Sequence, residues 1–143
     1  MRLTPAIAHA FDRVVPEGGD VICDTHLPGG TIVGISAVVV HQDKEIYGQD
    51  AHIYRPERWL EASKEQLKLM EKAFFTFGHG SRVCIGKNIG LTEVSKFVPR
   101  ILRRFDIEWA SDKPEWDMQM LWFTAQTGVV VRLTPRSIAE VKE

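Results

Sequence analysis

The pattern of apolar and polar residues predicts strands in the first part of the chain. Residues 21–23 and 31–33 are short apolar runs on either side of 27–30, where Pro then Gly suits the central positions of a type II turn. A hairpin is therefore expected there, with Cys23 facing the interior of its strand. Residues 35–40 are almost all apolar, which predicts a strand buried on both faces.

The segment before these strands is interrupted by turn-forming residues. Pro16 and the pair Gly18-Gly19 indicate an extended connector over residues 6–19. Pro5 disfavours a helical conformation in the residue before it, so residues 1–5 are expected to be the end of a helix.

A short helix is predicted over residues 64–72. Ser63 and Gln66 form the capping-box pattern Ser-x-x-Gln, in which the hydroxyl accepts a hydrogen bond from a backbone N–H of the first turn. Leu67 and Met70 would face inward from this helix.

Helical spacing returns after position 84 and predicts a longer helix that ends near Arg104. Pro99 removes one backbone hydrogen bond, so a kink is expected. Residues 105–109 predict a strand, and residues 120–124 and 129–134 a hairpin, with a tail after position 135 that frays. Helices and hairpins together indicate an α+β fold.

Composition excludes several classes of protein. The chain has 143 residues, enough for one domain, and its 44% hydrophobic and 26% charged residues are typical of a globular protein. A net charge of −1 gives no reason to expect nucleic acid or an anionic membrane as partner. No run approaches the roughly 20 apolar residues of a transmembrane helix. Two cysteines do not make a disulfide framework, and a reducing compartment is the default.

The chemistry is concentrated in the run Phe77-Gly78-His79-Gly80-Ser81-Arg82-Val83-Cys84-Ile85-Gly86. A thiolate is a soft metal ligand, and unpaired N–H groups at a helix start would favour it at Cys84. Gly80 and Gly86 suit a backbone with positive φ or one that lies flat against a planar ligand. Phe77 can shield the sulfur, and Arg82 offers a fork for a carboxylate. This set describes a haem iron held by Cys84, with a propionate on Arg82.

Two other interpretations of the cysteines are an ordinary buried residue and a zinc ligand. A lone cysteine is most often a small buried apolar residue, which is the interpretation we keep for Cys23 but not for Cys84. His79 lies five residues before Cys84, yet no second Cys-x-x-Cys or His pair accompanies it, so zinc is not expected.

The run resembles the cysteine-ligand loop of the cytochrome P450 haem-thiolate monooxygenases, Phe-x-x-Gly-x-Arg-x-Cys-x-Gly, with all five positions present. The resemblance implies haem b as cofactor, Cys84 as the proximal iron ligand and Arg82 as a propionate contact. It implies that Phe77 shields the thiolate and that the helix passes the porphyrin at Gly86. Gly80 is the remaining position of the loop. Arg13 matches the place where many fungal relatives have a second propionate-binding arginine.

A second resemblance concerns Pro56-Glu57-Arg58-Trp59, similar to the family's Pro-Glu-Arg followed by an aromatic residue. The resemblance implies that Arg58 and Arg2 form a triad with a glutamate, which would lie before Met1. The two arginines would then face each other without their anion, at a cost of about 3 to 5 kcal/mol if the site is buried. His41 stands where the family often has His-Arg-Asp, but the next residue is Gln, so we assign it no function.

The resemblance implies that residues 1–143 are one partial cytochrome P450 domain, the C-terminal, proximal haem-binding part of a mainly helical fold. We find no oxygen-activating helix and no N-terminal helices over the distal face. Exposed apolar patches, with low solubility, partial folding or association with another chain, are therefore expected. In the family, the end of the chain lines the substrate pocket, which makes Phe123 and Thr124 candidates for substrate contact.

Three functional hypotheses follow. The first is a monooxygenase by ancestry that oxidises a small organic molecule or secondary metabolite, with electrons from an NADPH-dependent reductase. The second is a truncated, non-catalytic remnant, and the third is a haem-binding protein that pairs with another chain. We do not expect this chain alone to be active. Full-length members of the family in fungi are expected at the cytoplasmic side of the endoplasmic reticulum.

Overall fold

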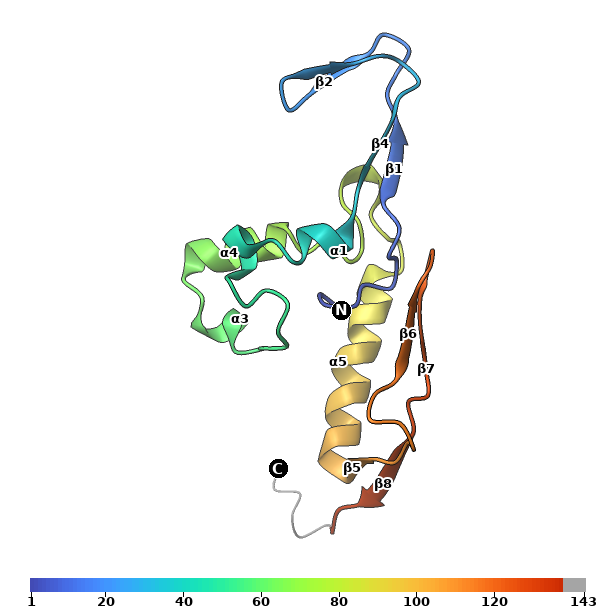
Figure 1. Ribbon diagram of the computed structural model, residues 1–143. Helices are drawn as coiled ribbons and strands as arrows, with labels where there is room; N and C mark the ends of the chain where they lie inside the picture. Colours follow the sequence, from blue (N-terminus) through green and yellow to red (C-terminus); the bar gives the residue numbers. More distant parts are fainter. Residues whose placement is uncertain (138–143) are drawn as a thin grey trace. The chain divides into compact units, whose positions relative to one another are not determined.

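The computed structural model describes residues 1–137, which form short helices and two-stranded antiparallel sheets (Figure 1). This mixture agrees with the predicted α+β class. The chain divides into two compact units, which are described separately. The first comprises Met1–His79 and Met120–Thr124, and the second comprises Gly80–Gln119 and the residues from Ala125 onward. That residues 1–143 make one domain stays a prediction.

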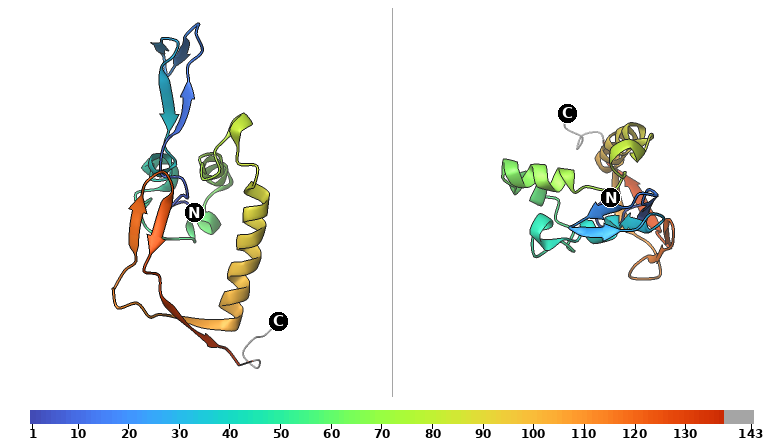
Figure 2. Two further views of the ribbon diagram at one scale, coloured as in Figure 1. Left: turned by 90° about the vertical axis from the view of Figure 1, so that its right-hand side faces the viewer. Right: turned by 90° about the horizontal axis from the view of Figure 1, so that it is seen from above.

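The first unit contains two nested hairpins. Strand β1 (Phe11–Val14) pairs antiparallel with β4 (Ile32–Ile35), so that Phe11 lies opposite Ile35. Between them, β2 (Asp20–Ile22) pairs with β3 (Thr25–Leu27). Figure 2 shows the β2–β3 hairpin at the far end of the β1–β4 ribbon.

The predicted pairing of these strands was wrong in two respects. Residues 20–22 pair with 25–27, not with 31–33, and the chain reverses at Cys23 and Asp24, whose φ values are 49° and 59°. Two consecutive residues with positive φ are what a tight type I′ hairpin turn requires, because its twist matches that of the strands. Cys23 is therefore exposed in a turn and does not face a strand interior.

The expected turn after Leu27 exists, but one residue later than predicted. The Thr31 N–H donates to the Pro28 carbonyl at 3.2 Å, and Gly30 has the positive φ of 84°. This turn joins the inner hairpin to β4. Its partner β1 lies within the segment predicted as a connector.

Residues 35–40 do not form a buried strand. Helix α1 (Ala37–Val40) occupies most of the run, with Ala37 fully buried and Val39 71% exposed. A short apolar run is compatible with either structure, so the pattern alone could not decide between them.

The other helices of the first unit enclose a small core. They are α2 (Lys44–Tyr47), α3 (Arg58–Glu61) and α4 (Lys64–Lys72). The predicted helix α4 is confirmed, since Ser63 Oγ accepts a hydrogen bond from the Gln66 N–H at 3.1 Å.

Tyr47, Ala51 and Met70 form the buried cluster, and Leu67 packs against it. The Tyr47 hydroxyl donates to the Met70 carbonyl at 3.0 Å. The predicted inward orientation of Leu67 and Met70 is confirmed.

The second unit is built on the long helix α5 (Lys87–Arg104), which follows the 3₁₀ turn η1 (Gly80–Arg82). Strand β5 (Phe105–Trp109) comes directly after α5, as predicted. Pro99 lies inside α5, which continues to Arg104, and the kink there stays a prediction. No residue of α5 is buried, and its apolar side chains include Ile89 (66% exposed) and Phe97 (65% exposed), in agreement with the expected apolar patches.

The predicted hairpin of 120–124 with 129–134 was wrong. Strand β8 (Val131–Pro135) pairs with β5, with Phe105 opposite Pro135, whereas β6 (Asp117–Met120) pairs with β7 (Thr124–Thr127). The prediction paired two segments that are neighbours in the sequence. The partner of β8 is instead β5, which comes before β6 and β7 in the chain. Arg136 donates from its backbone N–H to the Arg104 carbonyl at 2.8 Å, and the tail at 138–143 lies outside the described residues.

Candidate functional site

The segment from Phe77 to Gly86 leads into α5. Gly80 has a φ of 67°, the left-handed conformation expected for it, whereas Gly86 has a φ of −82°. The Lys87 N–H donates to the Cys84 carbonyl at 3.2 Å, so Cys84 directly precedes the first turn of α5. The predicted helix start after Cys84 is confirmed. Positive φ does not explain Gly86, and its expected role against a planar ligand stays a prediction.

The surroundings of Cys84 fit a ligand that approaches from solvent. The thiol is exposed and free, and a Cβ built at Gly86 would lie 3.8 Å from the Cys84 sulfur, within contact distance. A larger side chain at position 86 would therefore cover the sulfur. The N-terminus of α5 favours an anion such as a thiolate, because its first N–H groups have no partner within the helix. A soft ligand of this kind suits the haem that the sequence predicts.

Arg82 is exposed at the end of η1 and, within residues 1–137, makes no ion pair. Its guanidinium is thus available to a carboxylate ligand. Arg13 is exposed on β1 and donates to the Asp12 carbonyl at 2.6 Å. Phe77 and Arg13 belong to the first unit, and Arg82 and Cys84 to the second, so the expected site that combines them stays a prediction.

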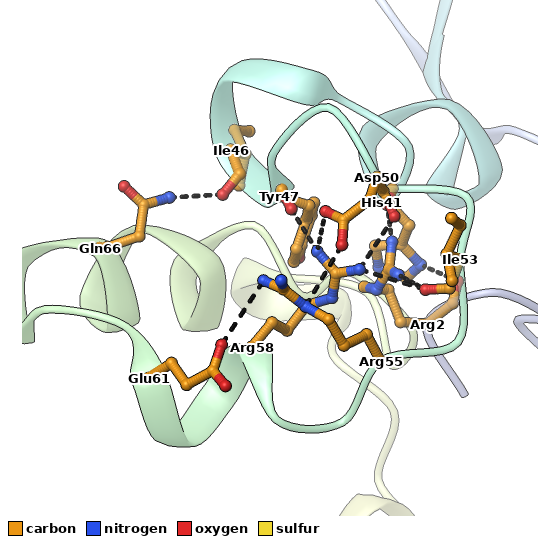
Figure 3. A network of polar contacts seen from close by, with 10 residues as sticks. All are labelled: Arg2, His41, Ile46, Tyr47, Asp50, Ile53, Arg55, Arg58, Glu61 and Gln66. Atoms are coloured by element: carbon orange, nitrogen blue, oxygen red, sulfur yellow. Dashed lines mark hydrogen bonds and ion pairs between the residues drawn. The ribbon is translucent and has the colours of Figure 1, made fainter.

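The structure brings Arg2 and Arg58 together, as the resemblance implied (Figure 3). Both are buried, at 9% and 4% exposure. The guanidinium of Arg58 donates to the carbonyls of Tyr47, Asp50 and Ile53, the last two at 2.9 and 3.1 Å. Arg2 donates to the His41 carbonyl and lies 4.8 Å from the centre of the Tyr47 ring.

The expectation that these arginines lack an anion was wrong for Arg58. The Asp50 carboxylate is 3.1 Å from Arg58 Nη1 and 3.2 Å from Arg55 Nε. Desolvation opposes ionisation of Asp50, but the hydrogen bond from Arg58 and the charges of both arginines outweigh it and lower the pKa of Asp50. Arg58 Nε has no partner within residues 1–137, so the network is incomplete around that atom.

Burial first, and the charge of Arg58 second, lower the pKa of Arg2. Carbonyl oxygens and the Tyr47 ring thus surround Arg2 in place of a carboxylate of its own. Figure 3 shows the side chain of Asp50 directed from the loop that follows α2 towards Arg58.

His41 is the residue of this network to which the sequence motifs assign no function. Its side chain is fully buried, with Nδ1 2.9 Å from the Arg2 carbonyl and Nε2 accepting the Phe75 N–H at 2.8 Å. Desolvation lowers the pKa of His41, and the charge of Arg2 acts in the same direction. A histidine at the end of an apolar run was the only sequence signal of this burial.

The candidates for substrate contact lie on the segment 120–124. Phe123 is 63% exposed and forms a β-bridge with Ile7. The Thr124 hydroxyl donates to the Pro5 carbonyl at 2.7 Å, so its proton is already used within the first unit. A contact of Phe123 or Thr124 with substrate stays a prediction.

Comparison with known proteins decides the family. Residues 1–137 match the family model described as Cytochrome P450. The chain belongs to the cytochrome P450 family. Membership implies a haem b cofactor with a cysteine thiolate ligand, and the described structure is a small α+β segment consistent with part of the P450 fold.

Its relatives are named as fungal monooxygenases. The chain is 43% identical over 140 residues to "Cytochrome P450 monooxygenase mpaDE" of Penicillium roqueforti, covering 98% of this chain and 16% of that protein. It is 44% identical to "Cytochrome P450 monooxygenase esdpH" of Penicillium shearii, with 95% and 27% covered. For "Cytochrome P450 monooxygenase ACRTS1" of Alternaria alternata the identity is 45%, with 96% and 36% covered. The chain thus spans between 16% and 36% of the length of these relatives.

No helix within residues 1–137 combines the length and the apolar character needed to cross a membrane.

Proposed function

We propose that this chain is the haem-binding segment of a P450 monooxygenase, with Cys84 as the iron ligand. The observation that carries the proposal is the position of the Cys84 thiol, exposed immediately before α5 with a glycine at position 86 beside it. Unpaired N–H groups at that helix end favour the anionic form of a ligand.

Each further residue of the loop has a distinct task in this proposal. Arg82, which has no ion-pair partner within the described residues, would bind a haem propionate through its planar fork. Phe77 would exclude water from the sulfur, and Gly80 allows the loop its left-handed turn. Arg13 would supply a second propionate contact. Bound haem supplies the activation of molecular oxygen, which no side chain of the chain can provide by itself.

The substrate class is proposed from the relatives. They are named monooxygenases of fungi, so a small organic molecule, such as a secondary metabolite, is the substrate that fits. The electron donor would be an NADPH-dependent reductase, and full-length members of the family would lie at the cytoplasmic side of the endoplasmic reticulum. Since the chain spans a minor part of each relative's length, we do not propose turnover by this chain alone.

The decisive experiment is the carbon monoxide difference spectrum of the haem-reconstituted chain after reduction with dithionite. We expect the long-wavelength Soret band of a thiolate-bound carbonyl in the wild type. Cys84→Ala should abolish the band, and Cys23→Ala should keep it, because Cys23 lies in the turn of the β2–β3 hairpin. No band in the wild type, or a band unchanged in Cys84→Ala, would contradict the proposal and favour a non-catalytic remnant.

Thiol alkylation gives a second readout that does not depend on the spectrum. Both cysteines are exposed, so iodoacetamide should modify both in the absence of haem. Haem should slow the modification of Cys84 and leave that of Cys23 unchanged. Equal rates at Cys84 with and without haem would argue against an iron–sulfur bond.

A further inference from the structure

His41 joins two segments that are far from it in the sequence. Its Nδ1 lies 2.9 Å from the Arg2 carbonyl, and its Nε2 lies 2.8 Å from the Phe75 amide nitrogen. The ring stacks on Phe74 with 5.4 Å between ring centres and meets the Tyr47 ring edge-on. The imidazole is therefore a buried link between the start of the chain and the segment that leads into the cysteine loop.

These two contacts fix the protonation state of the ring. A carbonyl oxygen can only accept a hydrogen bond, so Nδ1 must carry the hydrogen that points to Arg2. A backbone N–H can only donate, so Nε2 must be the unprotonated nitrogen that faces Phe75. Only the neutral Nδ1–H tautomer satisfies both partners. A second proton on Nε2 would point at the Phe75 N–H and remove that hydrogen bond.

The charges around His41 also oppose a second proton. Burial is the largest cause that lowers the pKa of His41. The hydrogen bond to the Arg2 carbonyl acts in the opposite direction, and the positive charges of Arg2 and of the Met1 amino group add to the lowering. From α2, Tyr47 faces the ring as a neutral phenol whose hydroxyl is bonded to Met70. Asp43, two residues further along, uses its carboxylate to cap α2.

Asp50 lies in the same network but pairs with Arg58 and Arg55 rather than with the imidazole. Phe74 and Phe75, from the segment after α4, present a ring and a backbone amide and no charge. No carboxylate is thus paired with His41 within residues 1–137, and its protonation would leave a buried cation without a partner.

The release of Phe75 would act on the loop that follows. The Phe75 carbonyl accepts from the Gly78 N–H at 3.0 Å, and its ring meets Phe11 of β1 edge-on at 5.1 Å. The next residue, Thr76, donates through its hydroxyl to the Met1 carbonyl at 3.4 Å. Without the imidazole, Phe75 keeps the contact of its ring with Phe11 and the hydrogen bond of its carbonyl with Gly78, but its amide loses the bond to His41.

We propose that His41 is a proton-sensitive clasp that holds the segment Phe74–Phe77 at the entry to the cysteine loop, and that protonation of its Nε2 releases the Phe75 amide. The inference rests on the first unit alone and stands whether or not the chain binds haem. It makes His41 a positioning residue whose effect depends on pH.

Amide hydrogen exchange followed by NMR tests the clasp in the full chain. The exchange rate of the Phe75 N–H, divided by its intrinsic rate at each pH, should rise by up to about tenfold per pH unit as the pH falls below 6.5, the ordinary pKa of a free imidazole, and should level off once the ring is protonated in the folded state. The Leu67 N–H, which donates to the Ser63 carbonyl at 2.8 Å in α4, is the internal reference and should not follow. An equal rise at Leu67 would indicate global unfolding and overturn the proposal.

Two substitutions separate the roles of the ring nitrogens. His41→Gln supplies a neutral oxygen in place of Nε2, so the Phe75 amide should stay protected and its pH dependence should vanish. His41→Asn keeps a donor in place of Nδ1 but cannot reach Phe75, which should exchange fast at every pH. His52→Gln, at an exposed histidine, is the matched control and should behave as the wild type. The same pH dependence in His41→Gln as in the wild type would refute the clasp.

A direct titration covers the case in which the variants do not fold. The ¹⁵N shifts of the wild-type imidazole report its tautomer and its protonation. The Nδ1–H tautomer at neutral pH, and a protonation midpoint that coincides with the loss of Phe75 protection, are expected. An Nε2–H tautomer, or protonation without any change at Phe75, would overturn the proposal.

Discussion

Arg2 and Arg58 donate to the same backbone oxygen, the carbonyl of Ile53, at 3.4 and 3.1 Å (Figure 3). Two like charges thus converge on one uncharged acceptor, which has two lone pairs to offer. The Asp50 carboxylate balances Arg58, while Arg2 depends on carbonyl oxygens and the face of the Tyr47 ring. The arrangement is held together by hydrogen bonds at least as much as by opposite charge.

Removal of Arg58 should therefore be costly. Arg58→Met removes the donor that the carbonyls of Tyr47, Asp50 and Ile53 share, and we expect a loss of about 3 kcal/mol in the free energy of unfolding. Arg55→Met removes an arginine that also pairs with Asp50 but is 46% exposed, and should cost about 0 to 1 kcal/mol. Urea denaturation of both variants measures the difference, and equal losses would refute the structural role of Arg58.

The N-terminal cap of α4 predicts a smaller loss of stability than the loss of Arg58, and a second serine provides the matched control. Ser63→Ala removes the acceptor of the Gln66 N–H and should destabilise the chain by about 1 kcal/mol. Ser36 precedes α1 but makes no capping hydrogen bond through its side chain, so Ser36→Ala should have little effect. Thermal unfolding checks both, and the opposite order of the two losses would contradict the cap.

Replacement by alanine of two glycines with open space around them should change the stability in opposite directions. A Cβ at Gly80 or at Gly90 meets nothing within 4 Å, but Gly80 has a φ of 67° and Gly90 lies inside α5. Gly80→Ala should therefore destabilise by about 1 kcal/mol, and Gly90→Ala should stabilise by about 0.5 to 1 kcal/mol. Denaturant midpoints measure both, and a gain at position 80 would show that its positive φ is absent in solution.

Tyr47 should ionise late in an alkaline titration. Burial raises the pKa of Tyr47 to about 12, whereas Tyr54 is 81% exposed. The Tyr47 phenol ionises more readily in the unfolded chain, so its contribution to stability is complete below pH 10 and is lost as the pH rises towards 12. Absorbance of phenolate should show a step near pH 12, and Tyr47→Phe should remove it. Tyr54→Phe should keep that step, and its absence from the wild type would contradict the burial of Tyr47.

The sequence predicted those parts of the fold that local chemistry decides. Ser63 and Gln66 specify the start of α4 by themselves, and a run of alternating residues directly after a helix gives β5. The prediction of a buried strand over residues 35–40 was wrong, because a short apolar run does not reveal whether it forms a strand buried on both faces or a helix buried on one. The predicted partner of β8 was wrong, because strand pairing depends on contacts between segments that are distant in the sequence.

The candidate site divides in the same way. The order of Phe77, Gly80, Arg82, Cys84 and Gly86 was sufficient to identify the family, and the family model confirms it. The proximity of Arg2 and Arg58 followed from the resemblance. The roles of Asp50 and His41 did not. Asp50 pairs with the side chains of Arg58 and Arg55, and His41 bonds to a backbone carbonyl and a backbone amide, and these groups come together only after folding. The ligand roles of the loop residues remain predictions.

The first unit is completed by residues 120–124, which lie far along the sequence from the residues they contact. Thr124 bonds to the carbonyl of Pro5 across 119 positions, while Trp122 accepts from the Ala8 N–H and stacks on His9. During synthesis, residues 5–9 therefore lack these partners until position 124 has left the ribosome. The entropic cost of closing such a loop grows only slowly with its length, so the main effect on folding is a delay. A nascent chain that stops before position 124 would leave residues 5–9 without these partners.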